Sequence, residues 1–200
     1  MNQVAKAKDL EAQLQRADSE LRLLQQISRY FAKTMPLAEA LRQSVRHTGE
    51  FLNAESCLLY LLSDGELVLC AAHGPNPGAV GEVRLRLDEG LTGWVARERR
   101  LLAISREAYH DSRFKFFRDL PEDTFEAFLS APVIVRNRVV GVINVQHRQV
   151  HSHTGEEMEV INTVGELIGG LVAIACLGQE QLDKPGFATL ALRPAFASRA

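Results

Sequence analysis

The chain has 200 residues, of which 46% are hydrophobic and 24% are charged, the composition of an ordinary globular protein. Lys and Arg number 23 against 25 Asp and Glu, so the net charge of −2 creates no field toward nucleic acid or an anionic membrane. Three cysteines provide no secreted disulfide framework, and no uninterrupted apolar run approaches the ~18 residues of a membrane span. These features predict a cytoplasmic protein of one domain with extensions, with no membrane and no nucleic-acid partner.

Residues 2–33 contain neither glycine nor proline and are rich in good helix formers. Apolar side chains recur there at alternating spacings of three and four, as in a coiled-coil seam: Ala7, Leu10, Leu14, Ala17, Leu21, Leu24 and Phe31. We therefore predict that residues 1–35 form a dimerisation and signalling helix. The alternative is a helix that packs on its own domain.

Residues 36–178 are predicted to form the globular domain. Its first hairpin is expected at Asp64-Gly65, since this pair between apolar runs is typical of a two-residue turn. In that hairpin Ser63 faces Glu66 and Leu59 faces Cys70.

A second hairpin is expected around Arg136-Asn137, with Val139, Ile143 and Val145 on one face of its second strand. Thr154 is the expected N-cap of the closing helix. Antiparallel hairpins with helices at both ends predict an α+β fold, an antiparallel sheet flanked by helices. Residues 179–200 are interpreted as a C-terminal tail.

Five segments resemble, in order, motifs of the GAF domain family. Residues 87–96 are similar to its Glu-Gly turn and short helix, and residues 109–114 to its Asp-x-Arg-Phe loop. Residues 128–135 and 139–145 resemble two of its strands, and residues 154–177 resemble its closing helix. Within the family, residues 111–115, 125–129 and 145–148 look most like the sensory domains of nitrogen-related phosphotransferase enzyme I and of the nitrogen-fixation activator. The resemblance implies a GAF fold and a sensor role.

The segment from Leu101 to Phe125 is long and aromatic for a plain connection, which favours a functional loop or lid. In GAF domains this segment covers one face of the sheet and encloses a small-molecule cavity. The candidate walls here are Trp94, Phe114, Phe125 and Phe128, in a segment that also contains Phe116 and Phe117. The candidate polar groups are Ser105, Ser130 and Asn144, with Arg113 and Lys115 available to an anion if they turn inward. The alternative is a filled core beneath a structured loop.

The enzyme branch of the family, the free methionine sulfoxide reductases, uses a cysteine near the turn at 90–93. Leu91 and Thr92 stand there in this chain, so no catalytic residue is predicted. His147, His151 and His153 are close in sequence but lack the usual partners of a zinc site, apart from two glutamates that the helix start explains. We interpret them as part of a solvated loop and predict no metal.

The sequence thus predicts a non-enzymatic cytoplasmic sensor that binds an unidentified small molecule. It would signal as a homodimer, through a helical bundle, to a downstream protein. A ligand-free dimerisation scaffold is the alternative, and a cysteine-dependent reductase is the third hypothesis.

Overall fold

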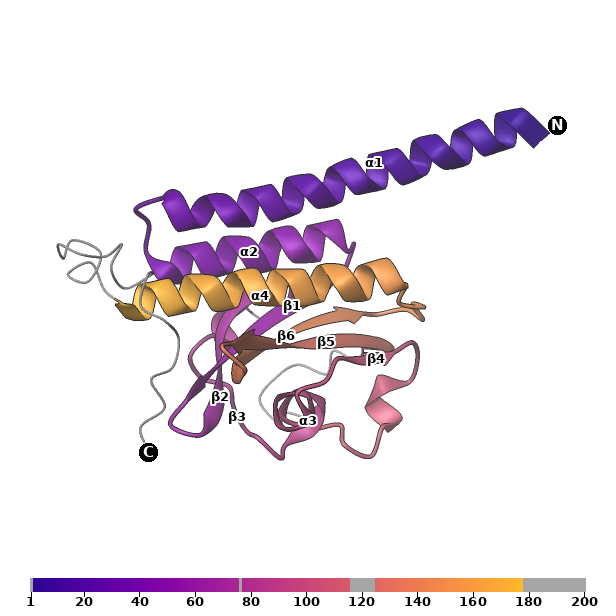
Figure 1. The fold of residues 1–200 in the computed structure, drawn as a ribbon. Helices are drawn as coiled ribbons and strands as arrows, with labels where there is room; N and C mark the ends of the chain where they lie inside the picture. Colours follow the sequence, from indigo (N-terminus) through magenta and orange to yellow (C-terminus); the bar gives the residue numbers. More distant parts are fainter. Residues whose placement is uncertain (1, 76, 116–124, 178–200) are drawn as a thin grey trace, which may run out of the picture.

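The computed structural model describes residues 2–75, 77–115 and 125–177 of the chain (Figure 1). Its helices are α1 (Asn2–Ser28), α2 (Leu37–Phe51), α3 (Gly90–Glu98) and α4 (Gly155–Leu177). Its strands are β1 (Ser56–Ser63), β2 (Glu66–His73), β3 (Arg84–Arg86), β4 (Leu102–Ile104), β5 (Ala127–Val135) and β6 (Arg138–His147). The predicted tail, residues 179–200, lies outside the described residues.

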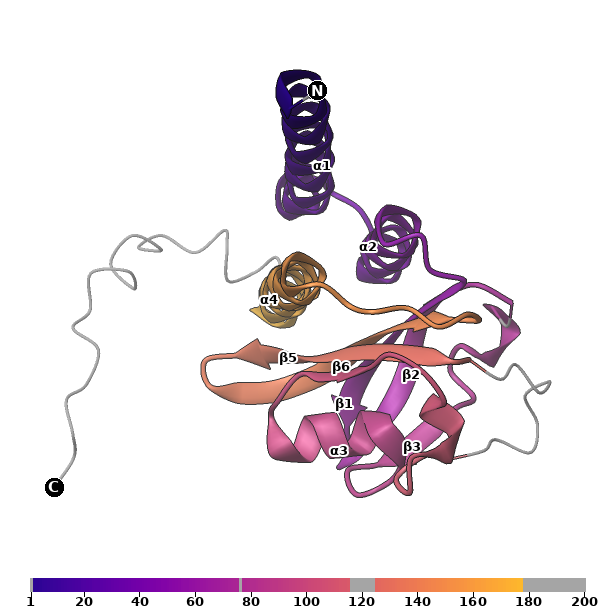
Figure 2. The same cartoon turned by 90° about the vertical axis from the view of Figure 1, so that its right-hand side faces the viewer.

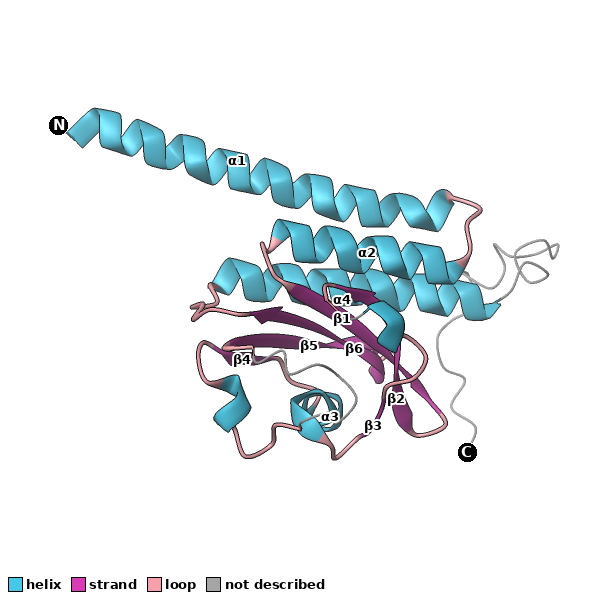
Figure 3. Ribbon diagram, turned by 180° about the vertical axis from the view of Figure 1, so that it is seen from behind, coloured by secondary structure: helices cyan, strands magenta, loops and turns pink. Residues whose placement is uncertain are grey.

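The strands form one antiparallel sheet in the order β3-β2-β1-β6-β5-β4. Helices α2 and α4 lie side by side on one face, and α1 lies on top of both (Figure 2). Helix α3 covers the other face, as the view from behind also shows (Figure 3). This arrangement confirms the predicted α+β fold with flanking helices and a long N-terminal helix.

Both predicted hairpins form, and both turns have positive φ at their two central residues. The φ angles are 51° at Asp64 and 84° at Gly65, and 45° at Arg136 and 64° at Asn137. Positive φ at both central positions is typical of a type I′ turn, whose twist matches that of the strands it joins. Ser63 pairs with Glu66 as predicted.

A β-bulge corrects the predicted register of the first hairpin. Leu59 pairs with Ala71, whereas Tyr60 pairs with Leu69, so Cys70 is an extra residue on β2. The predicted pairing of Leu59 with Cys70 is therefore wrong. A bulge places two residues of one strand opposite one of its partner, and the turn sequence alone does not reveal it.

A second bulge corrects the predicted faces of β6. Val133 pairs with Gly141 and Ile134 with Val139, which leaves Val140 as the extra residue. Val139 consequently packs on the α3 side, while Ile143 lies in the core on the other side. The prediction that these two side chains share a face is wrong because the extra residue reverses the alternation.

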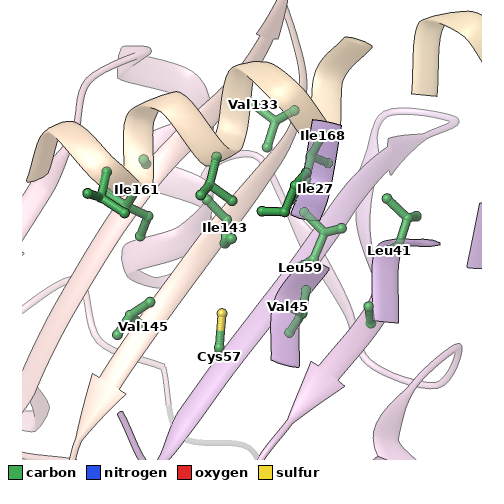
Figure 4. Packing of buried hydrophobic residues seen from close by; sticks show 14 of the residues in the cluster. Ile27, Leu41, Val45, Cys57, Leu59, Val133, Ile143, Val145, Ile161 and Ile168 are labelled. Carbon is green, nitrogen blue, oxygen red and sulfur yellow. The ribbon is translucent and has the colours of Figure 1, made fainter. Parts of the chain in front are cut away.

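The largest core cluster lies between the sheet and the helices (Figure 4). Ile27 of α1, Val45 of α2, Leu59 of β1, Ile143 of β6 and Ile168 of α4 are all 0% exposed. Burying each such side chain stabilises the fold by about 1.5–3 kcal/mol. The N-terminal helix is therefore attached to the domain by its last turns.

Helix α1 has two apolar faces with different surroundings. Leu23 and Ile27 are 3% and 0% exposed and pack on the domain, whereas Leu14 and Leu21 are 70% and 54% exposed. At about 100° per residue, Leu21 and Leu23 point about 160° apart around the helix. The N-terminal part of α1 projects past the sheet (Figure 1), and Leu10 on it is 66% exposed. The part of the predicted seam from Leu10 to Leu21 is thus separate from the face that contacts the domain, whereas Leu24 and Phe31 of the same seam are partly buried and pack against the core.

Helix α4 is long and apolar enough to cross a membrane by length and composition. Its side chains Val160, Ile161, Val164 and Ile168 are nevertheless buried in the cluster between sheet and helices. A helix that is apolar and packed in this way is typical of the core of a soluble domain.

Candidate functional site

Three buried polar side chains form a hydrogen-bonded chain between the sheet and α3. The hydroxyl of Ser130 donates to Oδ1 of Asn144 over 2.6 Å, and Nδ2 of Asn144 donates to Oγ1 of Thr92 over 2.8 Å. Their exposed fractions are 0%, 1% and 7% for Ser130, Asn144 and Thr92. Ser130 and Asn144 are opposite each other in the β5–β6 register, so their side chains emerge on the same face. The structure therefore brings these two predicted site residues together.

Thr92, the third member of this chain, was not among the predicted site residues. Thr92 lies on the buried side of α3, three and four residues before the buried Val95 and Ala96. A polar residue within a buried helical stripe is the signal that identifies it, because a buried hydroxyl needs a partner. Thr92 connects the sheet residues to the helix above them.

Helix α3 lies close to the sheet edge because of one glycine. A Cβ atom built on Gly93 would lie 2.5 Å from the carbonyl oxygen of Arg86 on β3. No side chain fits in that space without moving the backbone. The close approach positions Thr92 next to Asn144.

Three of the predicted aromatic walls lie on this side of the sheet. Phe128 is 3% exposed and forms a small cluster with Leu91 and Ala108, against which Phe114 packs. Trp94 is partly buried and packs against the neighbouring cluster on the same side of the sheet. Hydroxyl and amide groups among aromatic walls suit non-covalent binding of a small molecule.

Two other predicted residues lie elsewhere. The side chain of Ser105 is exposed, and its carbonyl oxygen accepts the backbone N–H of His151 over 3.0 Å. Phe125 is 7% exposed, with the guanidinium carbon of Arg148 5.7 Å from its ring centre. Both therefore lie toward the loop that follows β6. Phe116 and Phe117 lie outside the described residues.

The two candidate cations are each paired with a carboxylate. Arg113 donates to Asp111 through Nε over 2.8 Å and Nη2 over 2.6 Å, and its guanidinium carbon lies 4.5 Å from the ring centre of Trp94. Lys115 donates to Glu89 over 2.5 Å. These hydrogen bonds hold the pKa values of Asp111 and Glu89 below their usual range. The positive charges are therefore largely balanced before any anion arrives.

The cysteines have surroundings unlike those of a reactive thiolate. Burial raises the pKa of Cys57, which is 0% exposed. Burial also raises the pKa of the half-buried Cys70, against a smaller opposite effect of the Leu61 backbone. Cys176 is exposed near the end of α4. A nucleophilic cysteine requires a lowered pKa, which neither Cys57 nor Cys70 has.

The fold places an antiparallel sheet between a layer of helices and a single covering helix. The family model of the GAF domain matches residues 36–172. The chain belongs to the GAF domain family, as the resemblance in its sequence implied. The comparison with curated proteins found no match.

Two solved structures that resemble the chain are GAF domains of phosphoenolpyruvate-protein phosphotransferases. The domain from Acinetobacter is 26% identical with a TM-score of 0.73, and the match covers 82% of this chain and 97% of that one. The domain from Coxiella burnetii is 29% identical with a TM-score of 0.74, and the match covers 80% and 96%. These similarities confirm the predicted likeness to the phosphotransferase sensory domain.

A third solved structure belongs to an enzyme. Free methionine-R-sulfoxide reductase from Neisseria meningitidis, in complex with its substrate, is 14% identical with a TM-score of 0.66. The match covers 78% of this chain and 90% of that one. At this identity the similarity concerns the fold alone.

Proposed function

We propose that this chain is a non-enzymatic sensory or regulatory module that binds a small molecule between the sheet and α3. The observation that carries the proposal is the buried chain of Ser130, Asn144 and Thr92 beside Phe114, Phe128 and Trp94. Polar groups placed within apolar walls are the usual composition of a ligand site. The similarity to GAF domains of phosphotransferases supports a regulatory role.

The charges on this side of the sheet favour a particular ligand chemistry. Arg113 and Lys115 are bonded to Asp111 and Glu89, so a strongly anionic ligand would have to compete with two carboxylates. Hydroxyl and amide groups, by contrast, both donate and accept hydrogen bonds. We infer a ligand with neutral polar groups, which exchanges hydrogen bonds with Ser130 and Asn144.

Signalling is proposed to pass through a homodimer built on α1. The exposed side chains of Leu10, Leu14 and Leu21 support this, because a row of leucines spaced by four and seven residues needs a partner helix. A second copy of the chain provides the same row. Ligand binding would alter the packing of α1 on the domain and so the arrangement of the paired helices. The module would act in the cytoplasm on a downstream protein.

One measurement tests ligand and dimer together. Native mass spectrometry of the purified chain is expected to give two copies and a retained small molecule. Ser130→Ala is expected to lose that molecule, whereas Ser152→Ala, at an exposed position, retains it. A spectrum with no added mass contradicts the ligand site.

The dimer has its own pair of variants. Leu14→Glu introduces a charge into the exposed seam and is expected to give monomers in light scattering at micromolar concentration. Gln15→Glu changes the charge equally at a neighbouring exposed position and is expected to remain dimeric. A monomeric wild-type chain contradicts the proposal.

A ligand-free dimerisation scaffold is the second candidate function. The observation that favours it is the mutual pairing of Ser130, Asn144 and Thr92, which satisfies these groups without a ligand. A dimer with no retained molecule in the same mass spectrum supports the scaffold. A thiol-dependent assay for reduction of methionine sulfoxide is expected to be negative.

A further inference from the structure

Three of the six histidines converge at one end of the sheet, below the helical layer. His147 is the last residue of β6, and His151 and His153 lie in the connection to α4. One ring nitrogen of each lies within 4.8 Å of the others. The ring centres of His147 and His151 are 4.0 Å apart, and that of His153 is 5.0 Å from His151. Residues that are two to six positions apart in the sequence thus form one cluster.

The burial of this cluster corrects the interpretation of a solvated loop. The side chain of His153 is 1% exposed, that of His147 is 8% exposed and that of His151 is 32% exposed. The backbone explains the enclosure. The N–H of His151 donates to the carbonyl of Ser105 after β4, and the N–H of Arg148 donates to Glu55 before β1. The connection is folded onto the sheet at two points.

His153 is the most deeply buried member of the cluster. Within the described part of the chain, no partner lies in good hydrogen-bond geometry to either of its ring nitrogens, and the ring's contact with the backbone of Ile104 falls short of that geometry. The nearest carboxylate oxygen, Oε2 of Glu157, is 4.0 Å from Nδ1. A buried imidazole whose nitrogens lack well-formed hydrogen bonds is costly, and a bound ion is one partner that satisfies them. His147 and His151 are the neighbours that would bind the same ion as His153.

A carboxylate lies next to the cluster in the position that metal-binding histidines favour. Oε2 of Glu157 is 3.0 Å from Nε2 of His151. The same carboxylate accepts the backbone N–H of Thr154 over 3.0 Å, and the N–H of Glu157 donates to Oγ1 of Thr154 over 3.2 Å. This capping box fixes the glutamate in place. A carboxylate that binds one ring nitrogen orients the other nitrogen toward a metal ion.

We propose that His147, His151 and His153 together bind one divalent transition-metal ion, of which Zn²⁺ is the representative, with Glu157 orienting His151. Imidazole nitrogens suit zinc, copper and nickel, and three of them with a water molecule complete a tetrahedral zinc site. Zinc–nitrogen bonds of about 2.0–2.1 Å require nitrogens about 3.4 Å apart, so nitrogens that lie within 4.8 Å approach one another by up to about 1.4 Å on binding. His151 is the most exposed of the three, and its rotation provides this closure and a path for the ion.

The site is connected to the signalling helix. Nη2 of Arg16 on α1 lies 3.5 Å from Oε1 of Glu157, and Nε of Arg16 lies 3.0 Å from Oε2 of Glu156. An ion that moves the His151 ring toward His147 and His153 also moves the Glu157 carboxylate, which Arg16 contacts. Metal binding is thereby expected to change how α1 lies on α4. This part of the inference rests on the proposed signalling function, whereas metal binding itself does not.

The test uses the full chain without an affinity tag, stripped with a chelator and titrated with Zn²⁺ alone. Long-range ¹H–¹⁵N spectra report each histidine ring separately. One equivalent of Zn²⁺ is expected to shift the rings of His147, His151 and His153 and to leave those of His47, His73 and His110 unchanged. Shifts at other rings, or none, overturn the proposal.

Matched variants locate the ion by competition with a chromophoric chelator. His151→Gln is expected to lower the Zn²⁺ affinity more than tenfold, while His110→Gln, at an exposed position elsewhere, leaves it unchanged. Glu157→Gln retains the capping box and is expected to lower the affinity about 10–100-fold.

Cys176→Ser controls for binding by the exposed thiol and is expected to have no effect. A Zn²⁺ affinity that is unchanged in His151→Gln, or that is lost in Cys176→Ser, contradicts the site. Circular dichroism verifies that each variant is folded. A chain that binds Zn²⁺ yet is monomeric supports the metal site and contradicts the dimer separately.

Discussion

Replacing Asn144 with alanine is the sharpest perturbation of the interior that we propose as the ligand site. The side-chain amide accepts a hydrogen bond from Ser130 and donates one to Thr92, over 2.6 and 2.8 Å. Asn144→Ala removes both bonds at once. Two buried hydroxyls then lose their partner, at a place where α3 meets the sheet.

The magnitude follows from the burial of these groups. Ser130 is 0% exposed and Thr92 is 7% exposed, so water does not readily replace the amide. A buried polar group left without a partner costs about 1–3 kcal/mol. Because each hydroxyl keeps some freedom to rotate, we expect Asn144→Ala to lower the free energy of unfolding by about 2–4 kcal/mol. For a chain of this size, that corresponds to a fall of roughly 4–16 °C in the melting temperature.

The assay is urea unfolding followed by two probes. Trp94 is the single tryptophan and lies on α3, so its fluorescence reports the helix that Thr92 attaches to the sheet. Far-ultraviolet circular dichroism reports the whole fold. The matched control is Asn162→Ala on the exposed side of α4, which is expected to change stability by less than about 0.5 kcal/mol. The double variant Ser130→Ala/Asn144→Ala is expected to cost less than the sum of the single variants.

A loss in Asn144→Ala no larger than that in Asn162→Ala would refute the reasoning. Additive effects of Ser130→Ala and Asn144→Ala would also contradict it, because residues in one hydrogen-bonded chain are energetically coupled.

Two further predictions concern the elements around this interior. Gly93→Ala is expected to destabilise the fold by about 1–3 kcal/mol in the same urea assay, since its Cβ atom would lie 2.5 Å from the Arg86 carbonyl oxygen. Gly155→Ala, which meets nothing within 4 Å, is its control and is expected to be neutral or stabilising. The Arg113 guanidinium lowers the pKa of Asp111, so their bridge stabilises the fold above the unfolded-state pKa and is lost as the pH falls through the folded-state value. Asp111→Asn is thus expected to cost about 1 kcal/mol at neutral pH and nothing in acid, and an equal cost at both pH values would contradict the assignment.

The fold was largely predictable because its signals are local. The positive φ angles at Asp64-Gly65 follow from the residues of that turn, whereas Arg136 adopts a positive φ that its residue type does not favour. Residues 87–96, which resemble the turn and short helix of the family, contain the start of helix α3 at Gly90. The bulges at Cys70 and Val140 were not predictable, because packing on both sides of the sheet decides where an extra residue is accommodated.

The candidate site was predictable only in part. Ser130 and Asn144 meet because the bulge at Val140 shifts the hairpin register by one residue, whereas the turn alone would place Ser130 opposite Ile143. Thr92 joins them from a segment 52 positions away, and no local pattern indicates that contact. Ser105 and Phe125 share the aromatic segment in the sequence but lie toward the connection after β6.

The sequence by itself determined the helices, the hairpins and the family, because periodicity and turn chemistry act over a few residues. Only the tertiary structure decided which apolar face of α1 contacts the domain and which remains exposed. Only the tertiary structure brings the three histidines of this connection into an enclosed cluster. Backbone N–H groups of the connection hold it there by donating hydrogen bonds to the Ser105 carbonyl and the Glu55 carboxylate. This clustering depends on contacts between segments that are distant in the sequence. Those contacts stabilise the chain only when the whole sheet has formed.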